Sequence, residues 1–194
     1  MTGRLRIISG QWRGRKIPVV DRPGLRPTGD RARETLFNWL QGSLVGARCL
    51  DLFAGSGALG LEAASRGAGE VVLIERDRGL ARALDELVSG WPGADRVRVV
   101  NDDALAWLKT DTGQFDIVFI DPPFEAGLQQ RTLEVLVERD RLSPGARVYV
   151  EAAADESFDH GLESLPGFEV DREKRLGAVG MLLLRYTAGD RPAL

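Results

Sequence analysis

The pattern of apolar residues along residues 43–188 constrains the fold more than any other feature. Five short apolar runs, at residues 49–53, 71–74, 97–100, 115–120 and 148–150, are separated by segments with helical spacing. Such segments begin near residues 57, 103 and 127, and the clearest one places on one helical face Leu80, Ala81, Leu84, Leu87 and Val88. Apolar strands that alternate with helices predict an α/β fold with a mainly parallel sheet covered on both faces.

The C-terminal part departs from this alternation. Residues 168–173 and 180–186 are strand-like, and only residues 174–179 separate them. This connection is too short for a crossover helix, so the final pair of strands is expected to be antiparallel. A chain of 194 residues is expected to form one compact domain. Its parts are a basic N-terminal hairpin and helix at 1–42, the α/β core at 43–188 and a tail at 189–194.

Basic side chains are concentrated in the first 42 residues. This segment carries nine Lys and Arg against three Asp and Glu, although the whole chain has a net charge of -3. A basic arm on an acidic body predicts contact with a polyanion at one end, and a solvated surface hairpin explains the charge equally well. Residues 5–9 and 15–20 predict a β-hairpin, followed by a helix that Thr28 or Asp30 can cap.

A glycine-rich segment, DLFAGSGALG at residues 51–60, joins an expected strand to an expected helix. Gly55 and Gly57 allow the backbone to pass close to a ligand at the start of that helix. Asp51 ends the strand, where its carboxylate would attract an ammonium group and repel a pyrophosphate. Glu75 ends the next strand and can accept hydrogen bonds from both hydroxyls of a ribose. This pair favours S-adenosylmethionine as the ligand; the alternative is that both are ordinary strand-end acids.

The third strand is followed by a polar segment, Asn101-Asp102-Asp103-Ala104. Asp103 can accept a hydrogen bond from an adenine amino group, while the backbone N–H of Ala104 donates to the ring. A plain helix N-cap explains Asp102 or Asp103 equally well.

The most specific motif in the chain is IVFIDPPF at residues 117–124. Pro122 and Pro123 cannot continue a sheet ladder, so they predict a rigid exit at the carboxyl edge, where open α/β sheets bind ligands. The Asp121 carboxylate and the Pro122 carbonyl oxygen can accept from an exocyclic amino group, and Phe124 can stack on the ring. Asp121 can also take the proton that the nitrogen loses. The motif predicts N-methylation of a base; the alternative is a turn that only ends a strand.

Composition argues against several other classes of site. One cysteine, Cys49, and one histidine, His160, disfavour a zinc site or a Cys/His catalytic pair, so no metal is expected. No long apolar run predicts a membrane span, and the N-terminal residues do not resemble a secretion signal. A cytoplasmic protein is expected. The acidic segment at residues 151–163 is expected to be a solvated helix.

Four segments together resemble one family of bacterial enzymes. They are RIISGQWRGRKIPV at 6–19, RPTGDRARETLFNWL at 26–40, DLFAGSGALGLEA at 51–63 and IDPPF at 120–124. The chain resembles the 16S rRNA guanine-N2 methyltransferases of the RsmD family, within the class I S-adenosylmethionine-dependent methyltransferases. The resemblance implies a Rossmann-like fold, with a seven-stranded sheet whose last strand is antiparallel. The chain departs from the family pattern at Gly29 and Met181.

The resemblance also implies a substrate and a set of site residues. The substrate is the N2 amino group of a guanine in 16S rRNA of the small ribosomal subunit or its precursor, and the enzyme is expected to be a monomer. The residues expected at the cofactor are Asp51, Gly55, Gly57, Glu75, Asp103, Ala104 and Thr28, and those at the target base are Asp121, Pro122, Pro123 and Phe124. The residues expected to contact RNA are Arg4, Arg6, Trp12, Arg13, Arg15, Lys16 and Arg31.

Three alternatives remain open on the sequence alone. The DPPF motif also serves adenine-N6 and cytosine-N4 methylation, including methylation of DNA. A nicotinamide dehydrogenase can use the glycine loop and Glu75, but it leaves the DPPF motif and the antiparallel end unexplained. A noncatalytic RNA-binding assembly factor can be built on the same fold.

Overall fold

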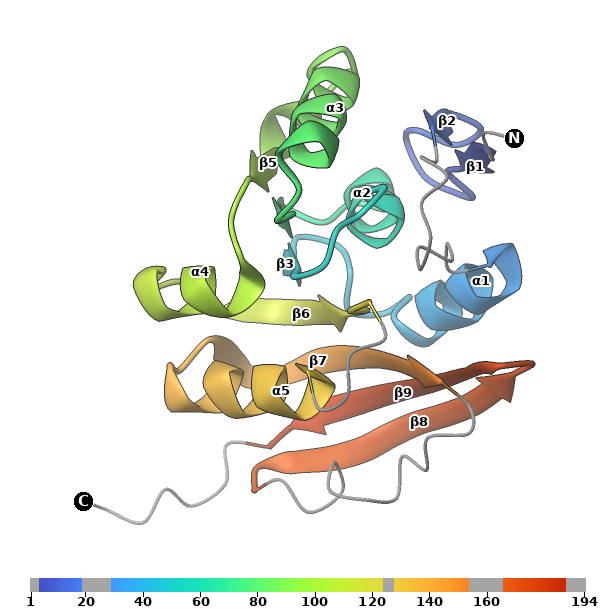
Figure 1. The fold of residues 1–194 in the computed structure, drawn as a ribbon. Helices are drawn as coiled ribbons and strands as arrows, with labels where there is room; N and C mark the ends of the chain where they lie inside the picture. Colours follow the sequence, from blue (N-terminus) through green and yellow to red (C-terminus); the bar gives the residue numbers. More distant parts are fainter. Residues whose placement is uncertain (1–3, 19–28, 124–127, 154–165, 188–194) are drawn as a thin grey trace.

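A computed structural model describes residues 4–18, 29–123, 128–153 and 166–187 of the chain. Helices and strands alternate between β3 and β7, as the apolar pattern predicts (Figure 1). The elements in chain order are β1 (Arg4–Arg6), β2 (Lys16–Pro18), α1 (Asp30–Trp39), β3 (Arg48–Asp51), α2 (Ala58–Ser65), β4 (Glu70–Ile74), α3 (Arg78–Ser89), the short 3-10 helix η1 (Ala94–Arg96), β5 (Val97–Val100), α4 (Ala104–Thr110), β6 (Phe115–Ile120), α5 (Leu128–Glu138), β7 (Leu142–Ala153), β8 (Phe168–Leu176) and β9 (Val179–Tyr186).

The main sheet has seven strands in the order β5-β4-β3-β6-β7-β9-β8. Strands β3 to β7 pair in parallel, and β9 pairs antiparallel with both β7 and β8. The predicted mainly parallel sheet and its antiparallel end are thereby confirmed. The chain passes from β3 to β4 on one side, whereas β6 lies on the other side of β3. This reversal of strand order is where open α/β sheets bind ligands, at the carboxyl ends of the strands.

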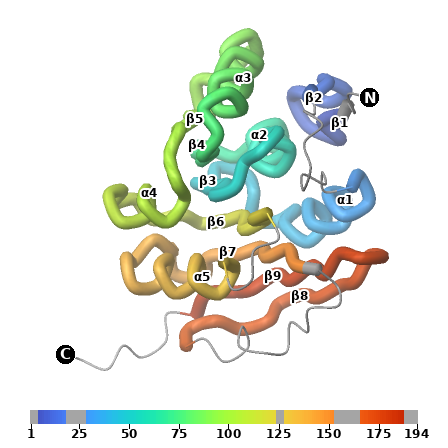
Figure 2. Tube along the Cα trace, in the orientation of Figure 1, coloured from blue at the N-terminus to red at the C-terminus, as the bar shows by residue number. Residues whose placement is uncertain are grey.

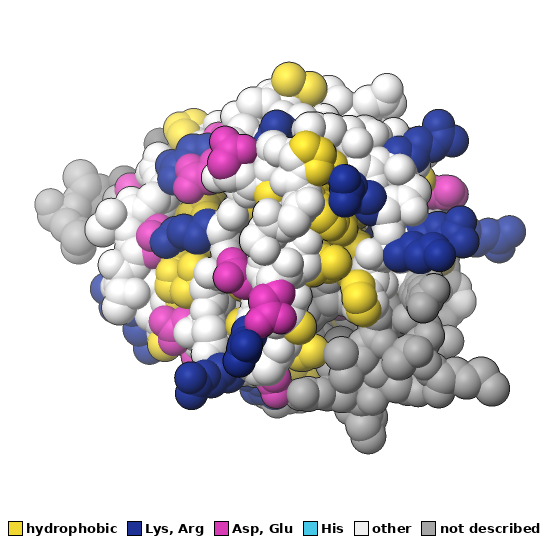
Figure 3. Space-filling model, turned by 90° about the horizontal axis from the view of Figure 1, so that it is seen from above, with side chains coloured by type: hydrophobic (Ala, Val, Ile, Leu, Met, Phe, Trp, Pro, Cys, Tyr) yellow, Lys and Arg dark blue, Asp and Glu magenta, His cyan; other side chains and the backbone are white. Residues whose placement is uncertain are grey.

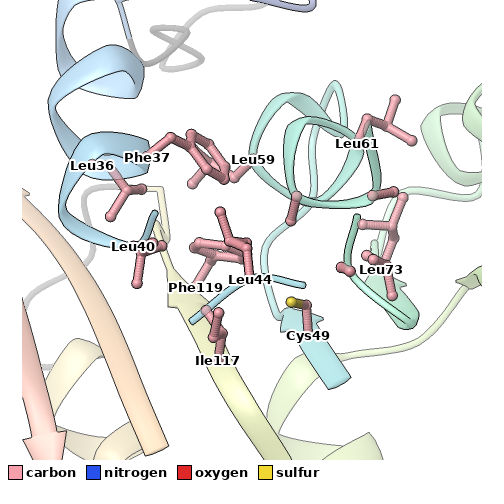
Figure 4. Packing of buried hydrophobic residues seen from close by; sticks show 14 of the residues in the cluster. Leu36, Phe37, Leu40, Leu44, Cys49, Leu59, Leu61, Leu73, Ile117 and Phe119 are labelled. Carbon is pink, nitrogen blue, oxygen red and sulfur yellow. The ribbon is translucent and has the colours of Figure 1, made fainter. Parts of the chain in front are cut away.

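Two hydrophobic clusters cover the two faces of this sheet. On one face, α1, α2 and α3 pack on Cys49, Ile117, Phe119 and Tyr149, and on the other α4 and α5 pack on residues such as Val118. The layers are visible in the tube view (Figure 2). Figure 4 shows Phe37 of α1 close to Phe119 of β6, with ring centroids 6.0 Å apart. The sheet is therefore buried on both faces, which its apolar strands require.

The N-terminal hairpin of β1 and β2 forms its own two-stranded sheet and docks on α2. The buried Glu62 carboxylate accepts from the backbone N–H of Ile8 at 2.7 Å and from that of Ser9 at 3.0 Å. The Ser65 hydroxyl accepts from the Trp12 N–H at 2.9 Å and donates to the Ser9 carbonyl at 2.6 Å. Ile7 belongs to the same hydrophobic cluster as the sheet, so the hairpin packs as an extension of the core.

Trp12 lies inside the protein, which corrects the expectation that it contacts RNA. Its side chain is 1% exposed, and its indole N–H donates to the Pro92 carbonyl at 2.9 Å. The ring packs edge-on against Trp91, with centroids 5.0 Å apart. A base cannot stack on a ring that is already enclosed. Trp12 instead anchors the hairpin loop to the connection between α3 and β5.

The start of α1 also differs from the prediction. Gly29 is the N-cap and supplies no side-chain hydrogen bond, whereas Asp30 is the first helical residue and not the cap. Asp30 accepts from the buried Arg33 guanidinium at 2.6 Å. The same guanidinium donates to the Arg6 carbonyl at 2.9 Å and lies 3.7 Å from Glu62. Arg33 therefore joins α1, α2 and the hairpin, and its charge is not available to RNA.

Within the described ranges, no helix is both long enough and apolar enough to cross a membrane.

Two hairpin glycines provide a matched test of this docking. Gly10 and Gly14 have φ values of +84° and +81°, but only at Gly10 would an added Cβ clash, 1.9 Å from the Ser65 carbonyl oxygen. We expect Gly14→Ala to lower the free energy of unfolding by about 1–2 kcal/mol, which is the cost of the left-handed backbone alone. Gly10→Ala should cost clearly more, as measured by urea denaturation. Equal losses in the two variants would contradict the close contact between the hairpin and α2.

Candidate active site

A cavity of about 800 Å³ opens at the carboxyl ends of the parallel strands. It is lined by residues 51–56 from the end of β3, 74–77 from the end of β4, 102–105 after β5 and 121–123 after β6. Residues 29, 31 and 32 at the start of α1, Glu151 of β7 and residues 176–179 around the β8–β9 turn also line it, as do Ala58, Leu59, Leu80 and Leu128. The cavity thus brings together the three motifs that the sequence separates by many residues.

The glycine loop adopts the backbone that its sequence predicts. Gly55 and Gly57 have φ values of +52° and +77°, in the left-handed region that favours glycine. Gly57 is the N-cap of α2, and Gly55 lies in the cavity wall. The backbone can therefore pass close to a bound molecule without side chains in between.

Asp51 is almost fully buried at the base of the cavity, with 1% of its surface exposed. Its Oδ2 accepts from the Gly60 N–H at 3.0 Å, while its Oδ1 is buried without a hydrogen-bond partner in the described ranges. Burial raises the pKa of Asp51 from 3.8 to about 7; the backbone N–H groups of Gly60 and Phe53 oppose the shift, and the nearby charge of Glu75 adds to it. A cation or an N–H donor beside Oδ1 would relieve this cost.

Glu75 closes the same loop from the neighbouring strand. One carboxylate oxygen accepts from the Gly55 N–H at 2.8 Å, and the other accepts from the Asp77 N–H at 2.7 Å. The side chain is 8% exposed and lines the cavity. Each oxygen can accept more than one hydrogen bond, so this carboxylate is fixed in orientation and still has acceptor capacity.

Asp103 and Ala104 lie at the start of α4, at the cavity edge. The exposed Asp103 is the N-cap of α4, because its side chain accepts from the Ala106 N–H at 3.0 Å. The helix-cap explanation of Asp103 is thus realised. Asp103 also lines the cavity. Its contact with an adenine ring stays a prediction.

Asp121, Pro122 and Pro123 follow β6 directly and line the cavity. Asp121 is half-buried, Pro122 is buried and Pro123 is exposed. Phe124, expected to stack on the base, and Thr28, expected at the cofactor, lie outside the described residues.

Glu151 and the β8–β9 turn are parts of the cavity that the sequence interpretation missed. Glu151 was expected in a solvated helix, but it lies in β7, is 6% exposed and lines the cavity. The signal was present, because Glu151 follows the apolar run 148–150 just as Glu75 follows 71–74. No sequence pattern predicts that the turn at 176–179 lies at the cavity, since only the pairing of β9 with β7 brings it there.

The basic residues expected at RNA lie mostly on the surface. Arg6, Arg13, Lys16 and Arg31 are exposed, and Arg31 also lines the cavity. Arg15 is half-buried, with its guanidinium carbon 5.1 Å from the centroid of Trp91. For Arg4 only the backbone is described. Dark blue side chains stand out at the right-hand edge of Figure 3, the side on which the hairpin and α1 lie in Figure 1.

A family model described as "Conserved hypothetical protein 95" matches residues 5–185. The "Ribosomal RNA small subunit methyltransferase D" of Escherichia coli strain K12 is 47% identical over 188 residues, which cover 96% of this chain and 92% of the relative. The chain belongs to this family. The family is the RsmD family that the sequence resembles. Its fold is that of the Rossmann-like methyltransferases, as the solved structures of similar proteins also show.

Solved structures agree with this assignment. Escherichia coli yhhF, described as a candidate methyltransferase, has a TM-score of 0.85 at 45% identity and covers 96% of this chain and 99% of its own. A 16S rRNA N2 methyltransferase of Thermus thermophilus, in complex with AdoMet and guanosine, has a TM-score of 0.67 at 26% identity. That match covers 96% of this chain and 50% of the other.

No group of three or more His, Cys, Asp and Glu side chains able to hold a metal ion occurs in the parts of the chain that the structure describes. The buried Cys49 packs in the core, where burial raises the pKa of its thiol.

The raised pKa of Asp51 predicts a specific dependence of stability on pH. The folded protein keeps a proton that the unfolded chain releases above pH 3.8. The stability that this group contributes is therefore present below that pH and is lost as the pH rises through about 7. Relative to Asp51→Asn, the wild type should lose up to about 4 kcal/mol of unfolding free energy across this window. Urea denaturation at a series of pH values measures the difference, and parallel pH profiles would contradict the shift.

Proposed function

We propose that this chain is an S-adenosylmethionine-dependent methyltransferase that modifies the N2 amino group of a guanine in 16S rRNA. The observation that carries the proposal is one shared cavity, in which Asp121 and its two prolines face the same space as Asp51 and Glu75. Membership of a family that includes a small-subunit rRNA methyltransferase supports the choice of substrate.

The acidic side chains that line the cavity suit S-adenosylmethionine. The buried Oδ1 of Asp51 has no hydrogen-bond partner among the described residues, so it calls for an ammonium or N–H donor, and S-adenosylmethionine carries an ammonium group. Glu75 would accept from the ribose hydroxyls, and Asp103 with the Ala104 N–H would hold the adenine. Gly55 lines the cavity without a side chain and leaves space for the bound molecule, whereas Gly57 keeps α2 close to Leu84 of α3. When bound, this cofactor supplies an electrophilic methyl group on a sulfonium sulfur.

The chain's own part in the reaction is to present and hold the amino group. The Asp121 carboxylate and the Pro122 carbonyl oxygen accept its two N–H bonds, which directs the nitrogen lone pair at the methyl carbon. A carbon–nitrogen bond forms as the carbon–sulfur bond breaks, and the electron pair of the broken bond stays on sulfur. The nitrogen then gives one proton to Asp121 or to water. The base must be unpaired or extruded from a helix to reach this position.

The remaining parts of the proposal concern the partner. The substrate is the small ribosomal subunit or its precursor, and the exposed arginines and Lys16 of the hairpin contact its phosphates. The protein acts as a monomer in the bacterial cytoplasm. Residues 1–42 serve as the RNA-binding extension of one catalytic domain that spans 43–188.

The direct test is transfer of a labelled methyl group to small ribosomal subunits that lack this modification. Nucleoside mass analysis should then find N2-methylguanosine. Methylated adenine or cytosine would overturn the assignment to guanine, and the absence of any transfer or of S-adenosylmethionine binding would overturn the proposed activity.

Asp121→Asn tests the catalytic role with little change in shape. We expect methyl transfer to fall by about 10²–10⁴-fold, because the amide loses the charge and one acceptor. Binding of S-adenosylhomocysteine, measured by calorimetry, should change by less than about threefold, since Asp121 is not among the residues proposed to bind the cofactor. Asp85→Asn, exposed on α3, is the matched control and should retain full activity. If Asp121→Ala retained the whole biological effect, a noncatalytic assembly factor would be the better explanation.

The hairpin charges are tested by the salt dependence of subunit binding. Arg13→Gln and Lys16→Gln should each weaken binding, and each should reduce the slope of log K against log salt by about 1 for each lost phosphate contact. Arg139→Gln, an exposed change after α5, serves as the control. An unchanged slope in both hairpin variants would remove the hairpin from the RNA interface.

A further inference from the structure

Glu151 provides a second carboxylate next to Asp121. In the parallel pairing of β6 with β7, Ile120 lies opposite Val150, so the next residues of the two strands, Asp121 and Glu151, occupy the same level. Neighbouring strands lie about 4.8 Å apart. Both residues line the cavity. The register therefore places two acidic groups side by side on one wall of the cavity.

The Glu151 side chain is held in a fixed orientation. It is 6% exposed, and its Oε2 accepts from the Tyr149 hydroxyl at 2.9 Å. Its backbone carbonyl accepts from the side-chain amide of Gln129 at 3.3 Å. Burial first, and then the charges of Glu151 and Asp121, raise the pKa of Tyr149, so this hydroxyl stays protonated and remains a donor. A carboxylate held in this way is preorganised to receive a ligand N–H.

Two adjacent acceptors select among the bases by their hydrogen-bonding edges. The Watson–Crick edge of guanine presents two neighbouring donors, the ring N1–H and the 2-amino group. Adenine and cytosine present an amino group next to a ring nitrogen that carries a lone pair. A carboxylate facing that lone pair is repelled and remains unpaired, which is costly at a buried site.

We propose that Glu151 is the residue that specifies guanine, by accepting the N1–H of the base while Asp121 and the Pro122 carbonyl hold its 2-amino group. This inference rests on the proposed function and deepens it. Leu176, Ala178 and Val179 of the β8–β9 turn line the same cavity and supply apolar surface for the ring. Asp121 and Pro122 would then position the amino group that reacts, and Glu151 would decide which base carries it.

A base analogue separates this role from a merely structural one. 2-Aminopurine keeps the 2-amino group but has a lone pair at N1 in place of the N–H. Small subunits can be reconstituted with guanine or 2-aminopurine at the accepting position, and kcat/KM compared for the full-length enzyme. The wild type should prefer guanine by at least about 100-fold. Glu151→Gln should lower that preference by at least about tenfold, because its amide can donate to the N1 lone pair.

A control variant and three outcomes separate a specificity role of Glu151 from a structural one. Glu169→Gln, the control, removes an exposed carboxylate on β8 and should leave the preference for guanine over 2-aminopurine unchanged. If Glu151→Gln lowers both rates equally, Glu151 only supports Tyr149 and the inference is wrong. If Glu151→Gln does not fold, the test is the wild-type ratio of kcat/KM for guanine to that for 2-aminopurine. A ratio below about threefold overturns the inference. Failure of the wild type to methylate guanine subunits would instead reject the proposed function itself.

Discussion

Four acidic side chains at one edge of the sheet determine what this cavity can bind. Asp51 on β3, Glu75 after β4, Asp121 after β6 and Glu151 on β7 come from four strands that are consecutive in the sheet and parallel. Carboxylates in a partly buried space are poorly hydrated and repel one another, and the raised pKa of Asp51 reports that cost. Ligands that bring positive charge and N–H donors reduce it. A sulfonium with an ammonium group and the amino edge of a base fit this requirement, whereas a pyrophosphate does not.

The hairpin and the glycine loop are attached to the same helix. Ala58 begins α2 in the cavity lining, and about one turn later Glu62 of the same helix binds the backbone of the hairpin. Glu62 also lies against Arg33 of α1 and accepts from Arg66 at 2.7 Å. The buried Glu62 carboxylate therefore joins the N-terminal hairpin, α1 and α2, the helix that follows the glycine loop. In such an arrangement the basic surface of the hairpin is held in a fixed position relative to the cavity.

Sequence patterns predict correctly those features that depend on interactions between residues close together in the chain. The strands and helices of the core follow from apolar spacing, and the left-handed glycines and the rigid exit at Pro122 follow from backbone geometry. The predictions for Trp12 and Glu151 were wrong because the positions of these side chains depend on residues far away in the chain. Trp12 lies between Gln11 and Arg13 in a segment with the composition of a surface loop, and only its docking on Trp91, far along the chain, buries it. Glu151 begins an acidic segment, and only the register with β6 turns it toward the cavity.

The α/β alternation, the antiparallel end, the glycine loop and the acidic exit from β6 could be predicted from the sequence, because each depends on residues within a few positions of one another. The folded structure was needed to show which acids share one cavity, that the β8–β9 turn lines it, and that Arg33 and Trp12 are enclosed. Those outcomes depend on strand order, register and burial, which bring together residues as far apart in the chain as Gly29 and Val179. Hydrophobic and hydrogen-bonding energies between such residues exist only once the chain has folded.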